Sequence, residues 1–174
     1  PYVYLDGISL KRTWGGEVRN VSILVAIGVA EDGYREILGI AEGCKEDKAG
    51  WSGFLAHLKK RGLQSPDLII SDKCMGLIES LEAYYPDAKW QRCTVHYYRN
   101  VFSVVPKGKM KEVAAMLKAI HAQEDLAEAQ AKAEAVAKKL QQIGLRAAAE
   151  KIRDGIGETL TYYHFPSEHR RHIW

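Results

Sequence analysis

The segment Leu68-Ile69-Ile70-Ser71-Asp72-Lys73 organises the rest of this chain. Its apolar run is typical of a short buried strand, and the run ends in an acid, Asp72. Tyr2-Val3-Tyr4-Leu5-Asp6 near the N-terminus has the same form and also ends in an acid. Two such strands side by side would bring two carboxylates together, which is the usual way for a protein to hold a divalent metal ion over a phosphate.

Strand and turn residues predict an antiparallel meander ahead of this stretch. We expect three strands at residues 2–10, 18–30 and 35–41, because these segments are rich in β-branched and other apolar residues. Turn residues separate them, with Gly15-Gly16 after the first strand and Glu31-Asp32-Gly33 after the second. Three sequential strands joined by tight turns form a meander.

The apolar period then changes to that of a helix. Apolar residues at i, i+3, i+4 and i+7 predict a helix over residues 48–60, and the strand at 68–71 follows it. A helix at 76–85 and a strand at 88–93 come next. A parallel strand that follows a helical crossover is expected beside the first strand, so Asp6 and Asp72 are predicted to lie on neighbouring strands.

Beyond Val95 the sequence predicts helices only. They are expected at residues 97–104, 109–122, 124–142 and 145–153. The alanine-rich block from Lys109 to Arg153 strongly favours helix and carries no chemistry of its own, so we interpret it as a scaffold, a lid or part of a DNA-binding surface. The predicted fold is α/β: a mixed sheet, with three antiparallel strands followed by helix-flanked parallel strands, precedes an all-helical block.

Basic residues gather in one segment of the chain. The formal net charge is +3 at pH 7, but seven basic residues and one acid lie between Lys89 and Lys118, so that segment carries +6 and the rest carries −3. The candidates for phosphate contact are Lys73, Arg92, Arg99, Lys107, Lys109 and Lys111. Such a block suggests a surface that faces a polyanion, although a solvated basic face would explain the charge alone equally well.

Length and composition limit the classes of protein to which this chain can belong. At 174 residues and 47% hydrophobic, the chain is long enough for one domain with a real core. No apolar run approaches the ~18 residues of a membrane span. Three widely spaced cysteines, Cys44, Cys74 and Cys93, fit a reducing cytosol better than a disulfide framework. Because neither Pro1 nor Trp174 looks like a natural terminus, we expect a piece of a longer protein.

Cys93 and His96 form a second cluster, three residues apart near the start of a helix. This spacing suits half of a zinc site, but no second Cys/His pair lies within the ordinary distance. As a Cys–His nucleophile the pair is weak, because neighbours at this spacing rarely align for attack and no third orienting group is present. The remaining interpretation is a core cysteine with a histidine that caps the strand–helix junction.

Three motifs resemble the Mutator-type (MULE-like) DDE transposases of bacterial insertion sequences. They are Leu5-Asp6-Gly7, Ser71-Asp72-Lys73-Cys74-Met75-Gly76-Leu77 and Gln91-Arg92-Cys93-Thr94-Val95-His96-Tyr97-Tyr98-Arg99-Asn100. In that family the first Asp lies on the first strand of a ribonuclease-H-like core, and the second Asp opens a turn that leads to a Gly. A Cys-x-x-His motif with a following Arg-Asn comes later. The resemblance covers essentially the whole chain.

The resemblance implies roles for individual residues. Asp6 and Asp72 would be the first two metal-binding catalytic carboxylates, and Cys93 and His96 would form the family's Cys-x-x-His motif close to the active site and the DNA. The family's third carboxylate is a Glu in a Thr-Asn-x-x-Glu-like motif, which would lie beyond Trp174. Glu168 belongs to the approach to that motif and not to the catalytic position. We therefore expect this fragment alone to be inactive.

The resemblance also implies a domain organisation. Residues 1–105 would form a ribonuclease-H-like core that is incomplete at its C-terminus, and residues 106–160 an all-helical insertion. Residues 161–174 would begin the return of the chain to the core.

The activity implied by the resemblance is metal-dependent DNA strand cleavage and strand transfer during DNA transposition. Two Mg²⁺ (or Mn²⁺) ions are expected in the complete site, and the expected partner is DNA, both at the element ends and at the target. The full-length protein is expected to be a homo-oligomer, without membrane attachment, in the bacterial cytoplasm at the nucleoid.

Two other classes stay open from the sequence. A ribonuclease-H-like nuclease or resolvase would share the two aspartates, but the long helical block argues against it. A non-catalytic DNA-binding remnant of a transposase would bind DNA and need no metal.

Overall fold

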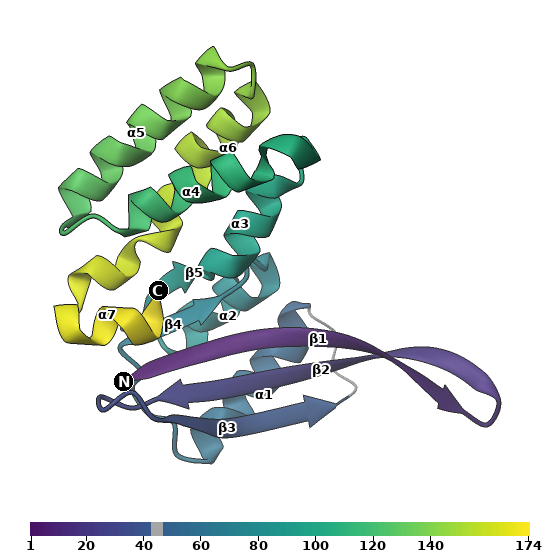
Figure 1. The fold of residues 1–174 in the computed structure, drawn as a ribbon. Helices are drawn as coiled ribbons and strands as arrows, with labels where there is room; N and C mark the ends of the chain where they lie inside the picture. Colours follow the sequence, from purple (N-terminus) through teal and green to yellow (C-terminus); the bar gives the residue numbers. More distant parts are fainter. Residues whose placement is uncertain (43–46) are drawn as a thin grey trace. The chain divides into compact units, whose positions relative to one another are not determined.

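The computed structural model describes residues 1–42 and 47–174 and shows a mixed α/β protein (Figure 1). Cys44 lies outside the described residues. The five strands of its sheet are β1 (Tyr2–Trp14), β2 (Glu17–Val29), β3 (Arg35–Glu42), β4 (Leu68–Ser71) and β5 (Lys89–Arg92). The α-helices in the described part are α1 (Lys48–Lys60), α2 (Met75–Tyr84), α3 (Thr94–Phe102), α4 (Met110–His121), α5 (Leu126–Gln142), α6 (Arg146–Gly155) and α7 (Ser167–Ile173). Short 3-10 helices are η1 (Lys107–Lys109), η2 (Ile156–Thr159) and η3 (Thr161–His164).

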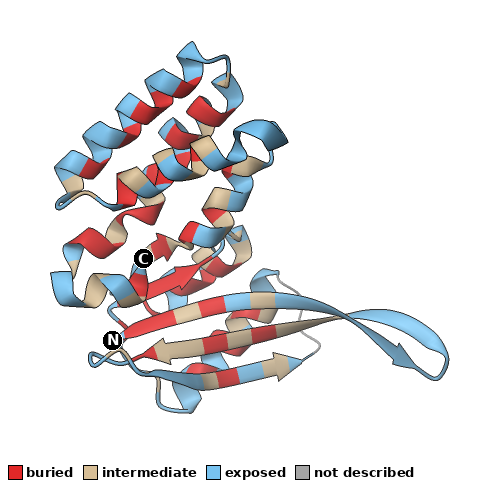
Figure 2. Cartoon of the chain, in the orientation of Figure 1, coloured by how far each residue is buried: buried red, intermediate tan, exposed pale blue. Residues whose placement is uncertain are grey.

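The sheet has the strand order β3-β2-β1-β4-β5. β1 pairs antiparallel with β2, β2 pairs antiparallel with β3, and β1 pairs in parallel with β4. The predicted meander and the predicted parallel neighbour of the first strand are therefore confirmed. β1 is longer than the predicted strand at 2–10, because its ladder with β2 continues as far as Trp14 opposite Glu17. Figure 2 shows that the outer part of this two-stranded ribbon is exposed.

The described chain divides into two compact units, residues 1–90 and 91–174. The boundary falls within β5, whereas the sequence suggested boundaries at 105 and 160; those domain limits stay a prediction. Among the described residues, no helix is both long and apolar enough to cross a membrane.

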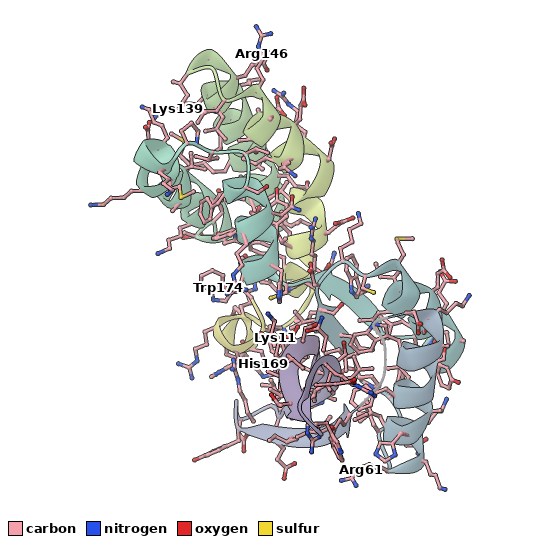
Figure 3. The ribbon with its side chains drawn as sticks, turned by 90° about the vertical axis from the view of Figure 1, so that its right-hand side faces the viewer. Lys11, Arg61, Lys139, Arg146, His169 and Trp174 are labelled. Atoms are coloured by element: carbon pink, nitrogen blue, oxygen red, sulfur yellow. The ribbon has the colours of Figure 1, made fainter. Side chains whose placement is uncertain are left out.

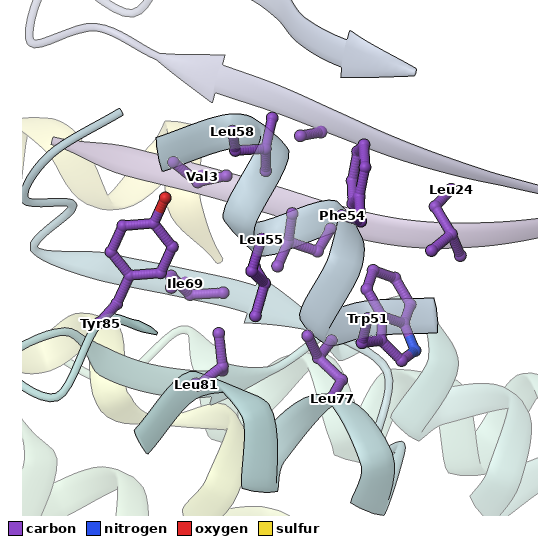
Figure 4. Packing of buried hydrophobic residues seen from close by; sticks show 12 residues of the cluster. Val3, Leu24, Trp51, Phe54, Leu55, Leu58, Ile69, Leu77, Leu81 and Tyr85 are labelled. Carbon is purple, nitrogen blue, oxygen red and sulfur yellow. The ribbon is translucent and has the colours of Figure 1, made fainter. Parts of the chain in front are cut away.

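The core of the first unit forms where α1 and α2 bury their apolar stripes against the sheet (Figure 4). α1 begins at the predicted residue because the Asp47 carboxylate accepts a hydrogen bond from the Gly50 N–H at 2.9 Å and so caps the helix. The buried cluster consists of Val3, Leu5, Leu24, Ala26, Trp51, Phe54, Leu55, Leu58, Ile69, Leu77, Leu81 and Tyr85. The face of β1 and β4 that carries Val3, Leu5 and Ile69 therefore packs against the helices.

The second unit contains the helices that the sequence predicted at 109–122, 124–142 and 145–153, which are α4, α5 and α6. α3 starts at Thr94 and not at the predicted Tyr97, because the Cys93 carbonyl accepts from the Tyr97 N–H at 2.9 Å and closes the first turn. The β-branched Thr94 and Val95 concealed this start, since such residues favour strands. α7 was not predicted; at seven residues it is too short to show a helical period.

His121 ends α4 in a buried aromatic cluster of this second unit and is only 8% exposed. Its Nδ1 lies 2.9 Å from the Tyr98 hydroxyl, and its Nε2 lies 3.0 Å from Thr159 Oγ1. Thr159 donates its own proton to the Ile156 carbonyl at 2.7 Å, so it accepts from His121 Nε2–H, which leaves Nδ1 to accept from Tyr98. Burial lowers the pKa of His121 from 6.5 to about 4, and the Leu117 carbonyl opposes this shift.

We expect His121 to make the fold less stable in acid. An unfolded histidine takes up a proton below about pH 6.5, whereas the buried ring resists protonation down to about pH 4. The unfolded state therefore binds more protons in this range. The contribution of His121 to the unfolding free energy falls by about 2 kcal/mol between roughly pH 7 and pH 4.5. Urea unfolding at a series of pH values checks this against His121→Gln, which should lack that share. Equal pH dependence of the two proteins would contradict the expectation.

Candidate active site

Asp6 and Asp72 lie at the end of the only ladder that joins β1 and β4 in the described sheet. The parallel register pairs Tyr2 with Leu68 and ends with Leu5 opposite Ser71, so each acid is the next residue on its strand. Neighbouring strands lie about 5 Å apart, and residues in register project to the same face. Asp6 lies on the face of β1 opposite Val3 and Leu5, which pack against α1 and α2, and Asp72 directly follows the residue that pairs with Leu5. Both residues are exposed.

The turn after Asp72 is fixed by hydrogen bonds of its neighbours. Trp90 Nε1 donates to Ser71 Oγ at 2.9 Å, and Ser71 Oγ donates to the Asp72 carbonyl at 2.8 Å. The Asp72 carboxylate itself accepts from the Lys73 N–H at 2.7 Å. These contacts hold the Asp72 backbone and orient its carboxylate, while leaving the side chain open to solvent. Lys73 is exposed directly beside it.

α2 starts three residues after Asp72 and is locked to the first turn of α1. At Gly76 a Cβ atom would lie 2.6 Å from the Lys48 backbone nitrogen, so only glycine fits there. Ser80, one turn further along α2, donates to the Gly76 carbonyl at 2.7 Å and lies 3.0 Å from Ser52 Oγ of α1. This close contact of the two helices sets where the Asp72 turn begins.

The carboxylates of Asp6, within β1, and of Asp72, directly after β4, are oxygen donors that fit a hard divalent cation. Mg²⁺ prefers carboxylate oxygens and keeps several waters, so it accepts a site with few protein ligands. In the described part of the chain, no three His, Cys, Asp or Glu side chains come together as a metal site would need. Asp6 and Asp72 therefore fit as part of a ligand set and do not make a complete one.

Cys93 and His96 belong to the second unit, where Cys93 is the N-cap residue of α3. Neither side chain caps that helix, so the predicted histidine cap at the strand–helix junction is not observed. His96 Nδ1 is buried and has no hydrogen-bond partner among the described residues. The zinc half-site gains no support there either, because no third ligand joins the pair in the described residues.

The other residues of the Gln91–Asn100 motif tie the helical unit together. Buried Gln91 donates from Nε2 to the Ile173 carbonyl and accepts the Tyr162 N–H at Oε1, both at 2.7 Å. The Tyr97 hydroxyl donates to the Lys151 carbonyl at 3.0 Å, and Lys151 Nζ donates to Asn100 Oδ1 at 2.7 Å. The motif that points most specifically to a family is thus largely structural in this unit.

The predicted phosphate-contacting residues divide into two groups. Arg92 is engaged within its own unit, because its guanidinium lies 3.5 Å from Glu158 Oε2 and 5.3 Å from the Tyr97 ring centre. We therefore leave Arg92 out of the set proposed below. Arg99, Lys107, Lys109 and Lys111 are all exposed, as expected for a nucleic-acid-facing surface. Lys109 also contacts Glu112 at 3.0 Å.

Glu168 lies in the first turn of α7 and is exposed. Hydrogen bonds from its own backbone N–H and from Ser167 hold its pKa below the usual range. The expectation that Glu168 is not the third catalytic acid stays a prediction.

Sequence patterns gave no role to several residues that the structure shows to matter. Gln91 was read only as part of a motif, because a buried glutamine with partners 71 and 82 residues away leaves no local pattern. Lys132 and Lys139 line a groove on α5. Their spacing of seven residues, which places both on one helix face, was the signal that could have singled them out.

Asp6 lies within β1 and Asp72 directly follows β4, the parallel neighbour of β1, and a mostly helical unit comes after them in the chain. The whole chain, residues 1–174, matches the profile of the transposases of the Mutator family. The chain therefore belongs to the Mutator family of transposases.

Curated relatives agree with this assignment. The chain is 38% identical over 176 residues to the transposase of insertion sequence element IS1081 from Mycobacterium tuberculosis, covering 100% of this chain and 42% of that protein. It is 32% identical over 172 residues to the transposase of IS256 in transposon Tn4001 from Staphylococcus aureus, covering 98% of this chain and 44% of the relative. The transposase of element IST2 from Acidithiobacillus ferrooxidans is 34% identical over 159 residues, covering 91% of this chain and 53% of the relative. The chain thus spans about half the length of the relatives it matches.

Proposed function

We propose that this chain supplies the ribonuclease-H-like catalytic region of a DDE transposase, which cuts DNA strands at the element ends and joins them to target DNA. The observation that carries the proposal is the β1–β4 register, which ends with Leu5 opposite Ser71, so that Asp6 and Asp72 directly follow a pair of neighbouring residues. Membership of the Mutator family supports the reaction class. The proposed substrate is DNA, and the proposed enzyme works as a homo-oligomer at the bacterial nucleoid.

In this proposal Asp6 and Asp72 hold Mg²⁺ or Mn²⁺, two ions in the complete site. The ions would stabilise the charge that develops on the scissile phosphate and lower the pKa of a bound water. Asp6 contributes a carboxylate from within β1, and Asp72 one that its own backbone turn orients. Exposed Lys73, and separately the exposed basic residues Arg99, Lys107, Lys109 and Lys111 of the second unit, are the proposed phosphate contacts.

The described residues offer two carboxylates to the metal ions and no third acid beside them. Two-metal phosphoryl transfer relies on two or three acids that hold both ions in place. We therefore propose that residues 1–174 by themselves bind the metal weakly and do not cut DNA. A non-catalytic DNA-binding role for these residues alone is the corresponding alternative.

Metal binding tests the two acids directly. Mn²⁺ titrations followed by electron paramagnetic resonance should show at least roughly tenfold weaker binding for Asp6→Asn and for Asp72→Asn, since each change removes one charged ligand. Asp67→Asn is the matched control, because it removes the same charge just before the opposite end of β4 and should leave the affinity unchanged. Equal Mn²⁺ affinity in all four proteins would rule the metal site out.

Strand transfer tests the reaction. The chain alone is expected to be inactive, whereas the chain joined to the portions of the IS1081 transposase outside the matched region should cut and join DNA when Mg²⁺ is present. Either asparagine variant should abolish that activity. Full activity of an Asp6→Asn or Asp72→Asn protein would overturn the catalytic assignment.

A further inference from the structure

The indole of Trp90 is hydrogen-bonded to the residue that precedes Asp72. Trp90 lies in β5, the neighbour of β4 in the sheet, and its Nε1–H donates to Ser71 Oγ at 2.9 Å. Ser71 is only 2% exposed, whereas side chains such as Lys11 and Arg61 are exposed at the surface of the first unit (Figure 3). Water therefore has little access to Ser71 and cannot easily replace a lost donor.

Ser71 passes this constraint to the peptide group between Asp72 and Lys73. A serine hydroxyl has one proton to donate, and here the proton goes to the Asp72 carbonyl at 2.8 Å while the oxygen accepts from Trp90. The Asp72 carbonyl also accepts from the Cys74 N–H at 3.0 Å. The carbonyl oxygen of this peptide group is thus held by two donors.

The same peptide group holds the carboxylate of Asp72. The Asp72 carbonyl and the Lys73 N–H belong to one planar unit, so a constraint on the oxygen also fixes the direction of the N–H. That N–H donates to Asp72 Oδ1 at 2.7 Å. A rotation of the peptide plane would therefore move the donor to which Oδ1 is bound.

The position of Trp90 is fixed by the core of the first unit. Its side chain packs against the buried cluster that α1 and α2 form with the sheet. Trp90, Ser71, Asp72 and Lys73 all lie within residues 1–90, so the whole series of hydrogen bonds belongs to one compact unit. The series connects the core to the carboxylate without using a charged group before Asp72.

We propose that Trp90 is a positioning residue for the metal site, which sets the direction of the Asp72 carboxylate through Ser71 and the Asp72–Lys73 peptide group. The inference rests on the proposed function, because the divalent cation is proposed there. Trp90 contacts neither the cation nor DNA in this proposal. Residues that orient a metal ligand change the metal affinity although they are not ligands themselves.

Two tryptophan-to-phenylalanine changes test the role of Trp90. Trp90→Phe keeps an aromatic ring and removes the donor, so the Mn²⁺ affinity measured by electron paramagnetic resonance should fall at least roughly fivefold. Trp51→Phe is the matched control, because Trp51 belongs to the same core (Figure 4) and its Nε1 has no hydrogen-bond partner among the described residues. The folded Trp51→Phe protein should bind Mn²⁺ as wild type does.

A double-mutant cycle shows whether Trp90 acts through Ser71. Ser71→Ala should lower the Mn²⁺ affinity by a similar factor, because it breaks the same series of bonds one step later. Trp90→Phe/Ser71→Ala should then bind within about twofold of Ser71→Ala alone, since changes within one hydrogen-bond network are not additive. Fully additive losses would mean that Trp90 does not act through Ser71.

Hydrogen exchange at the Lys73 amide, measured without metal, follows the peptide group itself. Relative to the amides of β4, the Lys73 amide should exchange faster in Trp90→Phe and unchanged in Trp51→Phe. A loss of Mn²⁺ affinity without faster exchange at Lys73 would show that the effect does not pass through the Asp72 turn, and the proposal would be wrong.

The remaining outcomes separate this proposal from the metal site on which it rests. If Asp72→Asn weakens Mn²⁺ binding and Trp90→Phe does not, or if Trp51→Phe weakens it as much as Trp90→Phe, only the role of Trp90 is wrong. If Asp72→Asn keeps the wild-type affinity, the metal site itself is wrong and the role of Trp90 falls with it.

Discussion

Replacing Gly76 with alanine is expected to lower the free energy of unfolding by about 3 kcal/mol, because the added methyl group has no space. It would lie 2.6 Å from the Lys48 nitrogen and 2.9 Å from the Asp47 carbonyl carbon, and both are backbone atoms that cannot rotate away. Alanine improves helix propensity by about 1 kcal/mol, which is too little to offset a forced separation of α1 and α2. Urea unfolding of the two proteins measures the difference.

Gly53→Ala is the matched control for this prediction. Gly53 lies in α1, is exposed, and has no atom within 4 Å of the position of an added Cβ. The same chemical change should therefore stabilise the protein by up to about 1 kcal/mol through helix propensity. Gly76→Ala should also weaken Mn²⁺ binding, because the displaced α2 carries the Asp72 turn with it. If both alanine variants stabilised the protein, the close contact of the helices would not be real.

Replacing Gln91 with leucine is expected to cost about 4 kcal/mol of unfolding free energy, since it leaves two buried backbone groups without a partner. The side chain of Gln91 is fully buried and serves the Tyr162 N–H and the Ile173 carbonyl, both at 2.7 Å. Leucine has a similar volume, so the loss comes from the missing hydrogen bonds and not from a cavity. Urea unfolding of the wild-type and Gln91→Leu proteins measures the total loss of unfolding free energy.

Amide hydrogen exchange separates this effect from a general loss of stability. The Tyr162 amide should lose its protection in Gln91→Leu far more than the amides of α5, because only the former depends on Gln91 directly. Gln141→Leu is the control, because Gln141 is exposed and its side chain only accepts from Arg153 at 3.2 Å. It should change stability by less than about 0.5 kcal/mol. A comparable loss in both variants would contradict the anchoring role of Gln91.

Local patterns carried most of the prediction of the fold. The α1 range was predicted well, because its apolar stripe lies within its own segment. The neighbouring positions of the two strands followed from strand order alone, and the parallel pairing of β1 with β4 confirms them. The start of α3 was placed too late, since Thr94 and Val95 have the composition of a strand and only the Tyr97–Cys93 hydrogen bond reveals a helix.

Contacts between distant residues were beyond the reach of sequence patterns. Arg92 was predicted to contact phosphate because it lies in the basic segment. Nothing in that segment indicates that Glu158 is its partner. Lys132 and Lys139 were not singled out, since only the packing of α4 against α5 creates the groove that they line. The metal-binding and catalytic roles of Asp6 and Asp72 stay predictions, and the experiments above are designed to test them.

The four-pair ladder between β1 and β4 also limits which insertions and deletions this chain can accept. Side chains alternate between faces along a strand, so a one-residue deletion within residues 2–6 or 68–72 would turn one carboxylate to the packed face. A residue added at Gly15-Gly16, in the exposed turn of the β1–β2 ribbon, shifts neither acid. Length variation among members of this family should therefore collect in such turns and be absent from the short segments that lead into the two acids.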